Sequence, residues 1–199
     1  MADKKKYRML NLLDGMISGC TKCPLYQNGR ATPYWIKNDN GNVPSFVIVG
    51  EAPGVNEVEN NEPFVGKAGQ ILWRIMDQYG FKKEQFLIIN SVNCRPVNGN
   101  KNGKPTQEQI NRCREWVNLY INTLMPLRGI LLGAYAQQSI MNESVDSVIQ
   151  NNCTLTLYQT NNMNTPLIPM VRSVHPAFSI YSQEGESLLE NSIKKFKLI

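Results

Sequence analysis

The sequence has few of the features that mark membrane, secreted or disordered proteins. No apolar run approaches the ~20 residues that a membrane span needs. The first residues lack the apolar stretch and the cleavage site of a secretion signal. Only 19% of the residues are charged and 42% are hydrophobic, which is typical of a globular protein with a substantial core. We therefore expect a cytoplasmic protein that does not associate with membranes.

Histidine is also scarce. The chain has one histidine, His175, and five cysteines. Disulfides are not expected, because the cytosol keeps thiols reduced, so the cysteines are candidate ligands, nucleophiles or core residues. Lys and Arg number 21 against 16 Asp and Glu, a net charge of +5. This modest excess fits a polyanionic partner without establishing one.

Apolar periodicity predicts strands that alternate with helices. Predicted strands cover residues 45–50, 86–90, 128–133, 153–158 and 167–171. Predicted helices end at Gly19, cover residues 68–79 and 134–141, and run from a capping box at Thr106 and Gln109 to Pro126. This alternation predicts an α/β fold, a three-layer αβα sandwich with a mainly parallel central sheet. At this length we expect one domain over residues 1–199.

Polar residues stand out directly after three of these strands. They begin at Glu51, at Asn90 and at Ser173, just before His175. In open α/β sheets, ligands bind beyond the carboxyl ends of the strands. The sequence therefore predicts that these three loops converge on one pocket.

The spacing of four cysteines indicates a metal centre. Cys20 and Cys23 form a C-x2-C pair, and Cys94 and Cys113 follow farther along the chain. Four thiolates can complete a [4Fe–4S] cluster or a tetrahedral zinc site, and the spacing alone leaves both open. Cys153 has no neighbouring cysteine, and we interpret it as structural.

Three motifs resemble those of the family 4 uracil-DNA glycosylases. Gly50-Glu-Ala-Pro-Gly-Val-Asn-Glu57, followed by Pro63-Phe-Val-Gly-Lys-Ala-Gly69, resembles motif 1 of that family. Asn90-Ser-Val-Asn-Cys-Arg-Pro96 resembles the next block, and Val174-His-Pro-Ala177 resembles the His-Pro-Ser motif. The motifs occur in the family's order, and the resemblance covers roughly residues 20–180.

The resemblance implies an activity and a cofactor. It implies the uracil-DNA glycosylase fold and a monofunctional DNA glycosylase of base excision repair, which flips a uracil out of DNA and hydrolyses its N-glycosidic bond. It also implies a [4Fe–4S] cluster on Cys20, Cys23, Cys94 and Cys113, in preference to zinc. The expected partner is single- or double-stranded DNA, and the expected state is a monomer.

The resemblance also implies roles for individual residues. Catalytic roles fall to Glu51, Asn90 and His175: His175 donates to the pyrimidine O2, and Asn90 reads the N3–H and O4 edge. Phe64 stacks on the flipped base. Glu51 or Glu57 positions water or holds the pocket, with Glu51 preferred because it lies nearest the strand end. The remaining substrate-binding candidates are Gly50, Ala52, Pro53 and Gly54, and the candidate phosphate contacts are Lys67, Arg95, Lys101, Lys104 and Arg172.

The sequence departs from the family pattern at several positions. Val58 stands where an acidic residue is usual, Asn61 where glycine is usual, and Ala177 where serine is usual. Residues 178–183 lack the basic residues that many relatives carry there. These departures leave two alternatives open: a glycosylase for another pyrimidine, such as a hydroxymethylated or glycosylated base of viral DNA, and a DNA-binding or polymerase-associated module without turnover.

Overall fold

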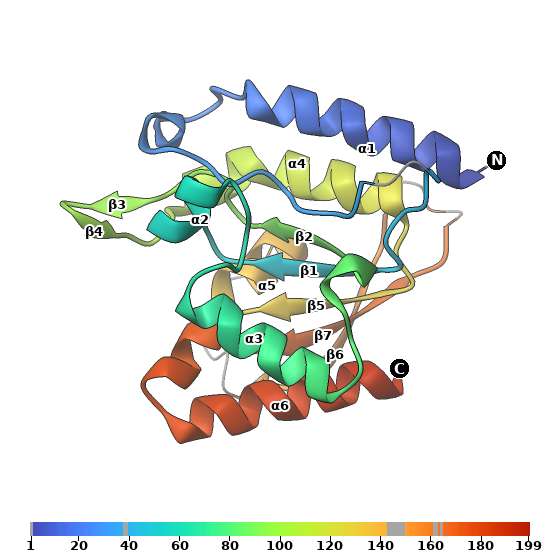
Figure 1. The fold of residues 1–199 in the computed structure, drawn as a ribbon, viewed down its shortest axis with the longest axis vertical. Coiled ribbons are helices and arrows are strands. Elements are labelled where there is room, and N and C mark those ends of the chain that lie inside the picture. Colours follow the sequence, from blue (N-terminus) through green and yellow to red (C-terminus); the bar gives the residue numbers. More distant parts are fainter. Residues whose placement is uncertain (1, 38–39, 143–149, 161–162, 164) are drawn as a thin grey trace.

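The computed structural model describes residues 2–37, 40–142, 150–160, 163 and 165–199. Its central sheet has the strand order β2-β1-β5-β7-β6 (Figure 1). The strands are β1 (Phe46–Gly50), β2 (Phe86–Asn90), β5 (Arg128–Leu132), β6 (Leu155–Tyr158) and β7 (Ile168–Ser173). Neighbours from β2 to β7 pair in parallel, and only β6 is antiparallel. The predicted mainly parallel sheet is confirmed.

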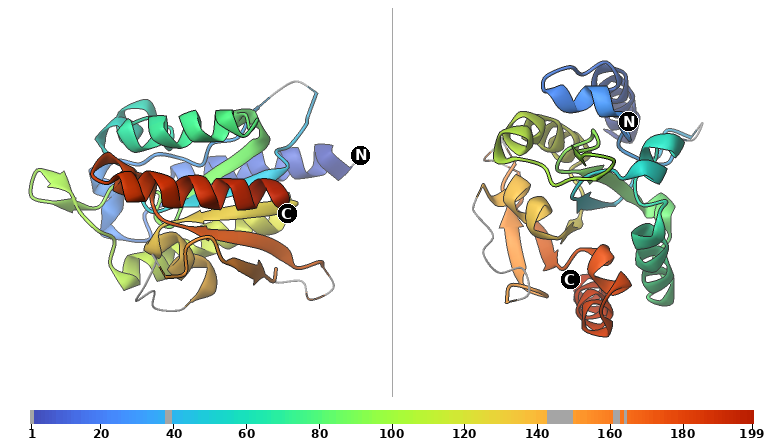
Figure 2. Two further views of the ribbon diagram at one scale, coloured as in Figure 1. Left: turned by 90° about the horizontal axis from the view of Figure 1, so that it is seen from below. Right: turned by 90° about the vertical axis from the view of Figure 1, so that its left-hand side faces the viewer.

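Helices cover both faces of the sheet, as Figures 1 and 2 show. On one face lie α4 (Gln107–Leu124) and α5 (Ala134–Met141), with α1 (Ala2–Ser18) packed over α4; on the other lie α3 (Lys67–Gln78) and α6 (Gln183–Leu198). Alternate residues of each strand enter opposite cores, so Val47 and Val49 face α4 while Ile48 faces α3. The three-layer αβα sandwich is therefore confirmed.

Local signals set most of the element boundaries. Thr106 caps α4 through a capping box with Gln109, as the sequence predicts. Pro169 lies near the start of β7, one residue before Met170, which is the first residue of β7 that pairs with β5. The missing N–H of Pro169 therefore removes no hydrogen bond between β7 and β5. The predicted strand at residues 153–158 begins instead at Leu155, because Cys153 has a left-handed backbone (φ 61°) that cannot extend a strand.

The structure also contains elements that the sequence analysis does not assign. These are α2 (Val55–Asn60), the hairpin of β3 (Val97–Asn98) and β4 (Lys101–Asn102), helix α6, and three 3-10 helices, η1 (Pro24–Asn28), η2 (Lys83–Gln85) and η3 (Pro176–Ile180). The sequence does contain a pattern that predicts α6, namely a serine at the N-cap position followed by apolar residues at helical spacing. In the structure Ser182 accepts a hydrogen bond from the Gly185 N–H, and Leu189, Ile193 and Phe196 are buried. The hairpin lies mostly within residues 98–104, a low-complexity segment of Asn, Gly and Lys in which apolar periodicity carries no information.

Candidate functional site

A pocket opens at the carboxyl ends of β1, β2 and β7, at the edge of the sheet marked by the strand arrowheads in Figure 1. Its volume is about 550 Å³. Its lining contains Glu51, Ala52, Pro53, Gly54, Glu57, Phe64, Lys67, Asn90, Asn102, His175, Ala177 and Tyr181, among others. The three predicted loops thus converge on one pocket, since parallel strands end at a common edge.

Gly50, a predicted substrate-binding residue, is not part of the pocket lining but packs against two residues that are. Gly50 and Asn90 are register partners at the ends of β1 and β2, and Asn90 is only 3% exposed. A Cβ at Gly50 would overlap Oδ1 of Asn90 and lie 2.7 Å from Cζ of Phe64. Glycine is therefore required at this position for the amide and the phenyl ring to meet over the strand end.

Phe64 and His175 form adjacent walls. Their ring centroids lie 6.0 Å apart with an interplanar angle of 30°. Phe64 has a left-handed backbone (φ 57°), an uncommon conformation for a bulky residue, and its carbonyl packs against Gly69 where a Cβ would clash. This strained loop turns an aromatic face toward the space beside the imidazole.

The backbone selects one tautomer of His175. Its Nδ1 accepts a hydrogen bond from the Ala177 N–H at 3.2 Å, so the neutral ring carries its proton on Nε2. Burial lowers the pKa of His175 to about 4. The imidazole is therefore neutral near pH 7 and offers one N–H donor. Gly133 packs against this side chain, where a Cβ would lie 2.9 Å from that of His175.

The two motif 1 glutamates have different environments. Burial raises the pKa of Glu51, and Lys104 partly opposes that shift. Glu57 instead accepts the Gly66 N–H at 2.8 Å through Oε1 and the Gly54 N–H at 3.1 Å through Oε2. Glu57 thus holds two loops of the pocket, while Glu51 is a partly buried carboxyl in the pocket lining.

The predicted phosphate contacts lie in different places. Lys67 lines the pocket, and Lys104 lies close enough to influence Glu51. Lys101 is in β4, and Arg95 donates from Nε to Oδ1 of Asn102 at 2.7 Å. Arg172 lies in β7 and is not part of the pocket lining; its buried Nε has no hydrogen-bond partner among the described residues.

The sequence analysis assigned no site role to several residues of the pocket lining, among them Asn102 and Tyr181. Asn102 reaches the pocket from the β3–β4 hairpin, and its Nδ2 would lie 3.0 Å from a Cβ at Gly54. Tyr181 stands at the rim and is 86% exposed. An aromatic residue shortly after the His-Pro motif was the available signal for Tyr181, whereas a low-complexity segment offered none for Asn102.

A second, small cavity of about 20 Å³ is lined by Cys20, Cys23, Cys94 and Cys113, among others. The N–H of Trp116 donates to Sγ of Cys20 at 3.4 Å, and Nδ2 of Asn93 donates to Sγ of Cys113 at 3.7 Å. Burial raises the pKa of the Cys113 thiol to about 12 and also raises that of Cys94. Cys153 lies elsewhere, where its thiol donates to the Asn191 carbonyl.

The donor set of this cavity fits an iron–sulfur cluster. Four thiols surround one space, and two N–H groups point at their sulfurs, which is the type of contact that supports ligating thiolates. Within the described ranges, no group of three or more His, Cys, Asp or Glu side chains is arranged around a single metal ion.

The fold and the pocket define an α/β protein with a polar, aromatic-walled ligand site at the carboxyl edge of its sheet. Residues 39–197 match the sequence profile of the Uracil DNA glycosylase superfamily. The chain belongs to this superfamily.

No helix among the described residues has the length and apolar character needed to cross a membrane.

Curated relatives carry a more specific name. A "Type-4 uracil-DNA glycosylase" of Sulfurisphaera tokodaii is 28% identical over 186 residues, which are 91% of this chain and 80% of the relative. One from Archaeoglobus fulgidus is 28% identical over 180 residues, 90% of this chain and 87% of the relative. One from Pyrobaculum aerophilum is 34% identical over 132 residues, 66% of this chain and 64% of the relative.

Proposed function

We propose that this protein is a uracil-DNA glycosylase that hydrolyses the N-glycosidic bond of a flipped uracil and leaves an abasic site. The observation that carries the proposal is the meeting of Asn90, Phe64 and a neutral His175 in one pocket. The relatives named as type-4 uracil-DNA glycosylases support the choice of uracil.

The proposed binding of the base uses an aromatic face and an amide. Phe64 stacks on the pyrimidine ring, and the burial of Asn90 makes an unmatched base edge costly. The amide can accept from N3–H and donate to O4, the pattern that uracil presents. Cytosine has no N3–H and carries an amino group at C4, so it would leave this amide mismatched.

The chemical step places negative charge on the departing base and positive charge on the sugar. Since Nδ1 of His175 is occupied by the Ala177 N–H, Nε2–H is the donor that can stabilise charge growing on O2. A neutral donor can do this without a prior protonation. Glu51 in its ionised form would stabilise the sugar cation or orient the attacking water.

The proposed DNA path runs over the rim of the pocket. Lys67, Lys104 and the β3–β4 hairpin with Lys101 and Arg95 offer cations near the mouth, and exposed Tyr181 offers a surface for a base or sugar. Arg172 remains a candidate contact from the sequence that lies apart from the pocket lining.

The cysteine centre is proposed to hold a [4Fe–4S] cluster through Cys20, Cys23, Cys94 and Cys113. When bound, the cluster would supply a cross-link between the N-terminal segment, the loop after β2 and α4. We also propose one domain over residues 1–199, since the described helices pack on one sheet. A monomer in the cytoplasm remains part of the proposal from the sequence.

The test is base release under enzyme excess from oligonucleotides carrying uracil, thymine, 5-hydroxymethyluracil or cytosine. We expect release of uracil, and His175→Ala should lower the single-turnover rate about 10²- to 10³-fold with little change in DNA affinity. Release of only a modified base would redirect the proposal to that base. Binding without release of any base would establish the non-catalytic alternative.

A further inference from the structure

Helix α2 lines the pocket with its first three residues and has no buried residues of its own. On the pocket side, its Glu57 accepts the backbone N–H groups of Gly54 and Gly66, and the carboxylate packs closely against both. Because a six-residue helix with no buried residues is not fixed by the core, its position depends on its remaining contacts. Those contacts therefore decide where Glu57 holds the pocket loops.

The C-terminal part of α2 contacts residues 29–32, which we call the strap. Oδ1 of Asn61 accepts hydrogen bonds from the N–H and the hydroxyl of Thr32 at 3.0 and 3.3 Å. Cγ1 of Val58 packs on Gly29 so closely that a Cβ there would clash. Asn61 ends α2 with a left-handed backbone (φ 49°), which asparagine tolerates better than most residues. Two positions that depart from the family pattern thus form the contact.

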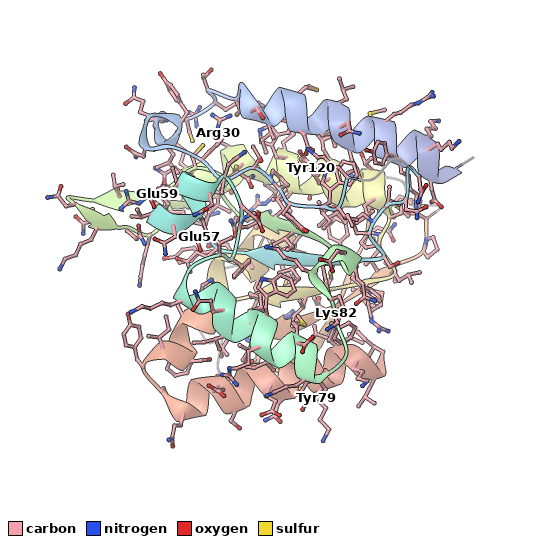
Figure 3. All side chains as sticks on the ribbon, in the orientation of Figure 1. Arg30, Glu57, Glu59, Tyr79, Lys82 and Tyr120 are labelled. Carbon is pink, nitrogen blue, oxygen red and sulfur yellow. The ribbon has the colours of Figure 1, made fainter. Side chains whose placement is uncertain are left out.

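The strap is bonded to the cysteine centre at several points. The Gly29 carbonyl accepts a hydrogen bond from the Arg95 N–H at 3.0 Å, and the Ala31 N–H donates to the Asn93 carbonyl at 3.0 Å. The strap is therefore bonded to the two residues that flank Cys94 in the chain. The Arg30 guanidinium donates to the carbonyls of Ile17, Ser18 and Cys20. Figure 3 shows Arg30 and Glu57 at the same end of the molecule.

We propose that the strap and α2 form a mechanical connection through which the cysteine centre positions the Gly54 and Gly66 loops of the pocket. Asn61 and Val58 are its positioning residues, and Glu57 is its end on the pocket side. The functional meaning rests on the proposed glycosylase activity. The connection is tested by hydrogen exchange at backbone amides. Its test is therefore independent of whether the protein releases uracil.

The first experiment measures amide hydrogen exchange at Gly54 and Gly66 in Asn61→Gly. Glycine keeps the left-handed backbone but removes the acceptor for Thr32, so both amides should exchange about tenfold faster, as expected for loss of one hydrogen bond. Asn61→Asp keeps an acceptor and should restore slow exchange. Glu59→Gln, on an exposed residue of the same helix, is the matched control and should match wild type. The visible absorption of the cluster should be unchanged in all three.

The second experiment removes the cluster from the holoprotein with a chelator, in wild type and in Asn61→Gly. In wild type, exchange at Gly54 and Gly66 should rise; in Asn61→Gly it should rise little further, because the connection is already broken. Val58→Ala should behave like Asn61→Gly. The proposal would be overturned if exchange at Gly54 and Gly66 were unchanged in Asn61→Gly. It would also be overturned if the variant and the chelator each raised the exchange rates by the same factor with or without the other. An equal rise at the buried amides of β1 would overturn it as well, because the effect would then not be confined to the pocket loops. Absence of uracil release by wild type would contradict the proposed function alone.

Discussion

The phenol of Tyr120 donates a hydrogen bond of 2.6 Å to Oδ1 of Asp14, deep in the core between α1 and α4. Oδ2 of the same carboxylate accepts the indole N–H of Trp35 at 3.0 Å and pairs with Lys37 at 2.8 Å. Tyr120 is labelled in Figure 3. Asp14 therefore joins α1 to α4 and to the segment before β1 through a buried carboxylate.

This network predicts a graded loss of stability. Tyr120→Phe removes one hydrogen bond to a charged acceptor and should lower the free energy of unfolding by about 1.5–3 kcal/mol. Asp14→Ala should cost more, because it leaves the buried indole N–H and the phenol without their acceptor. Urea denaturation of the two variants measures the difference. Equal stability of Asp14→Ala and wild type would contradict the role assigned to this carboxylate.

The cysteine centre predicts which thiols matter. Cys94→Ser should lose iron and sulfide and give a colourless protein, because a closed shell of four thiolates is broken. Cys153→Ser should stay brown with wild-type iron content, since Cys153 lies outside the cavity. Metal analysis of both purified variants is the measurement. A fully active, zinc-loaded wild-type protein would refute the cluster.

The raised pKa of Glu51 predicts that the single-turnover rate falls on the acid side of its pH profile. The pKa of Glu51 is raised by burial, so the ionised form is lost, and the rate falls, as pH drops through that raised value. His175 is neutral above its lowered pKa of about 4, so it adds no pH dependence at neutral pH. Single-turnover rates from about pH 5 to about pH 8 test this. Glu51→Gln should remove this acid-side fall, and His175→Ala should keep it at a lower rate.

Asn90 predicts the direction of a specificity change. Asn90→Asp replaces a donor by an acceptor, so it should oppose the O4 of uracil and accept from the amino group of cytosine. We expect uracil release to fall by about tenfold or more and cytosine release to become detectable. Parallel assays on uracil- and cytosine-containing strands measure the ratio. An unchanged ratio would place Asn90 outside base recognition.

The charge at the pocket mouth predicts salt-dependent DNA binding. Each phosphate contact contributes a slope of about −0.7 to −0.9 in log affinity against log salt, so Lys67→Ala should reduce the slope by about that amount. Arg172→Ala should have a smaller effect, since Arg172 lies apart from the pocket lining. A salt titration of both variants compares them. An affinity independent of salt would argue against a nucleic-acid substrate.

Much of the fold could be predicted from the sequence, because strands and helix ends are marked by patterns within a few neighbouring residues. β-Branched runs such as residues 46–50 mark buried strands, and Thr106 with Gln109 marks a helix start within four residues. The loops after β1, β2 and β7 were predicted to meet because parallel strands end at one edge. The roles assigned to Glu51, Asn90 and His175 stay predictions until activity is measured.

By itself, the sequence determined the α/β class, the strand-end positions of the polar residues and the family to which they belong, since these follow from short-range periodicity and contiguous motifs. Only the tertiary structure decided that four cysteines line one cavity, that Glu57 bonds to two loops of the pocket, and that Asn102 reaches the pocket from a hairpin. It also decided the tautomer of His175. These features depend on contacts between segments distant in sequence or on how a side chain meets a folded backbone, and neither leaves a local pattern in the chain.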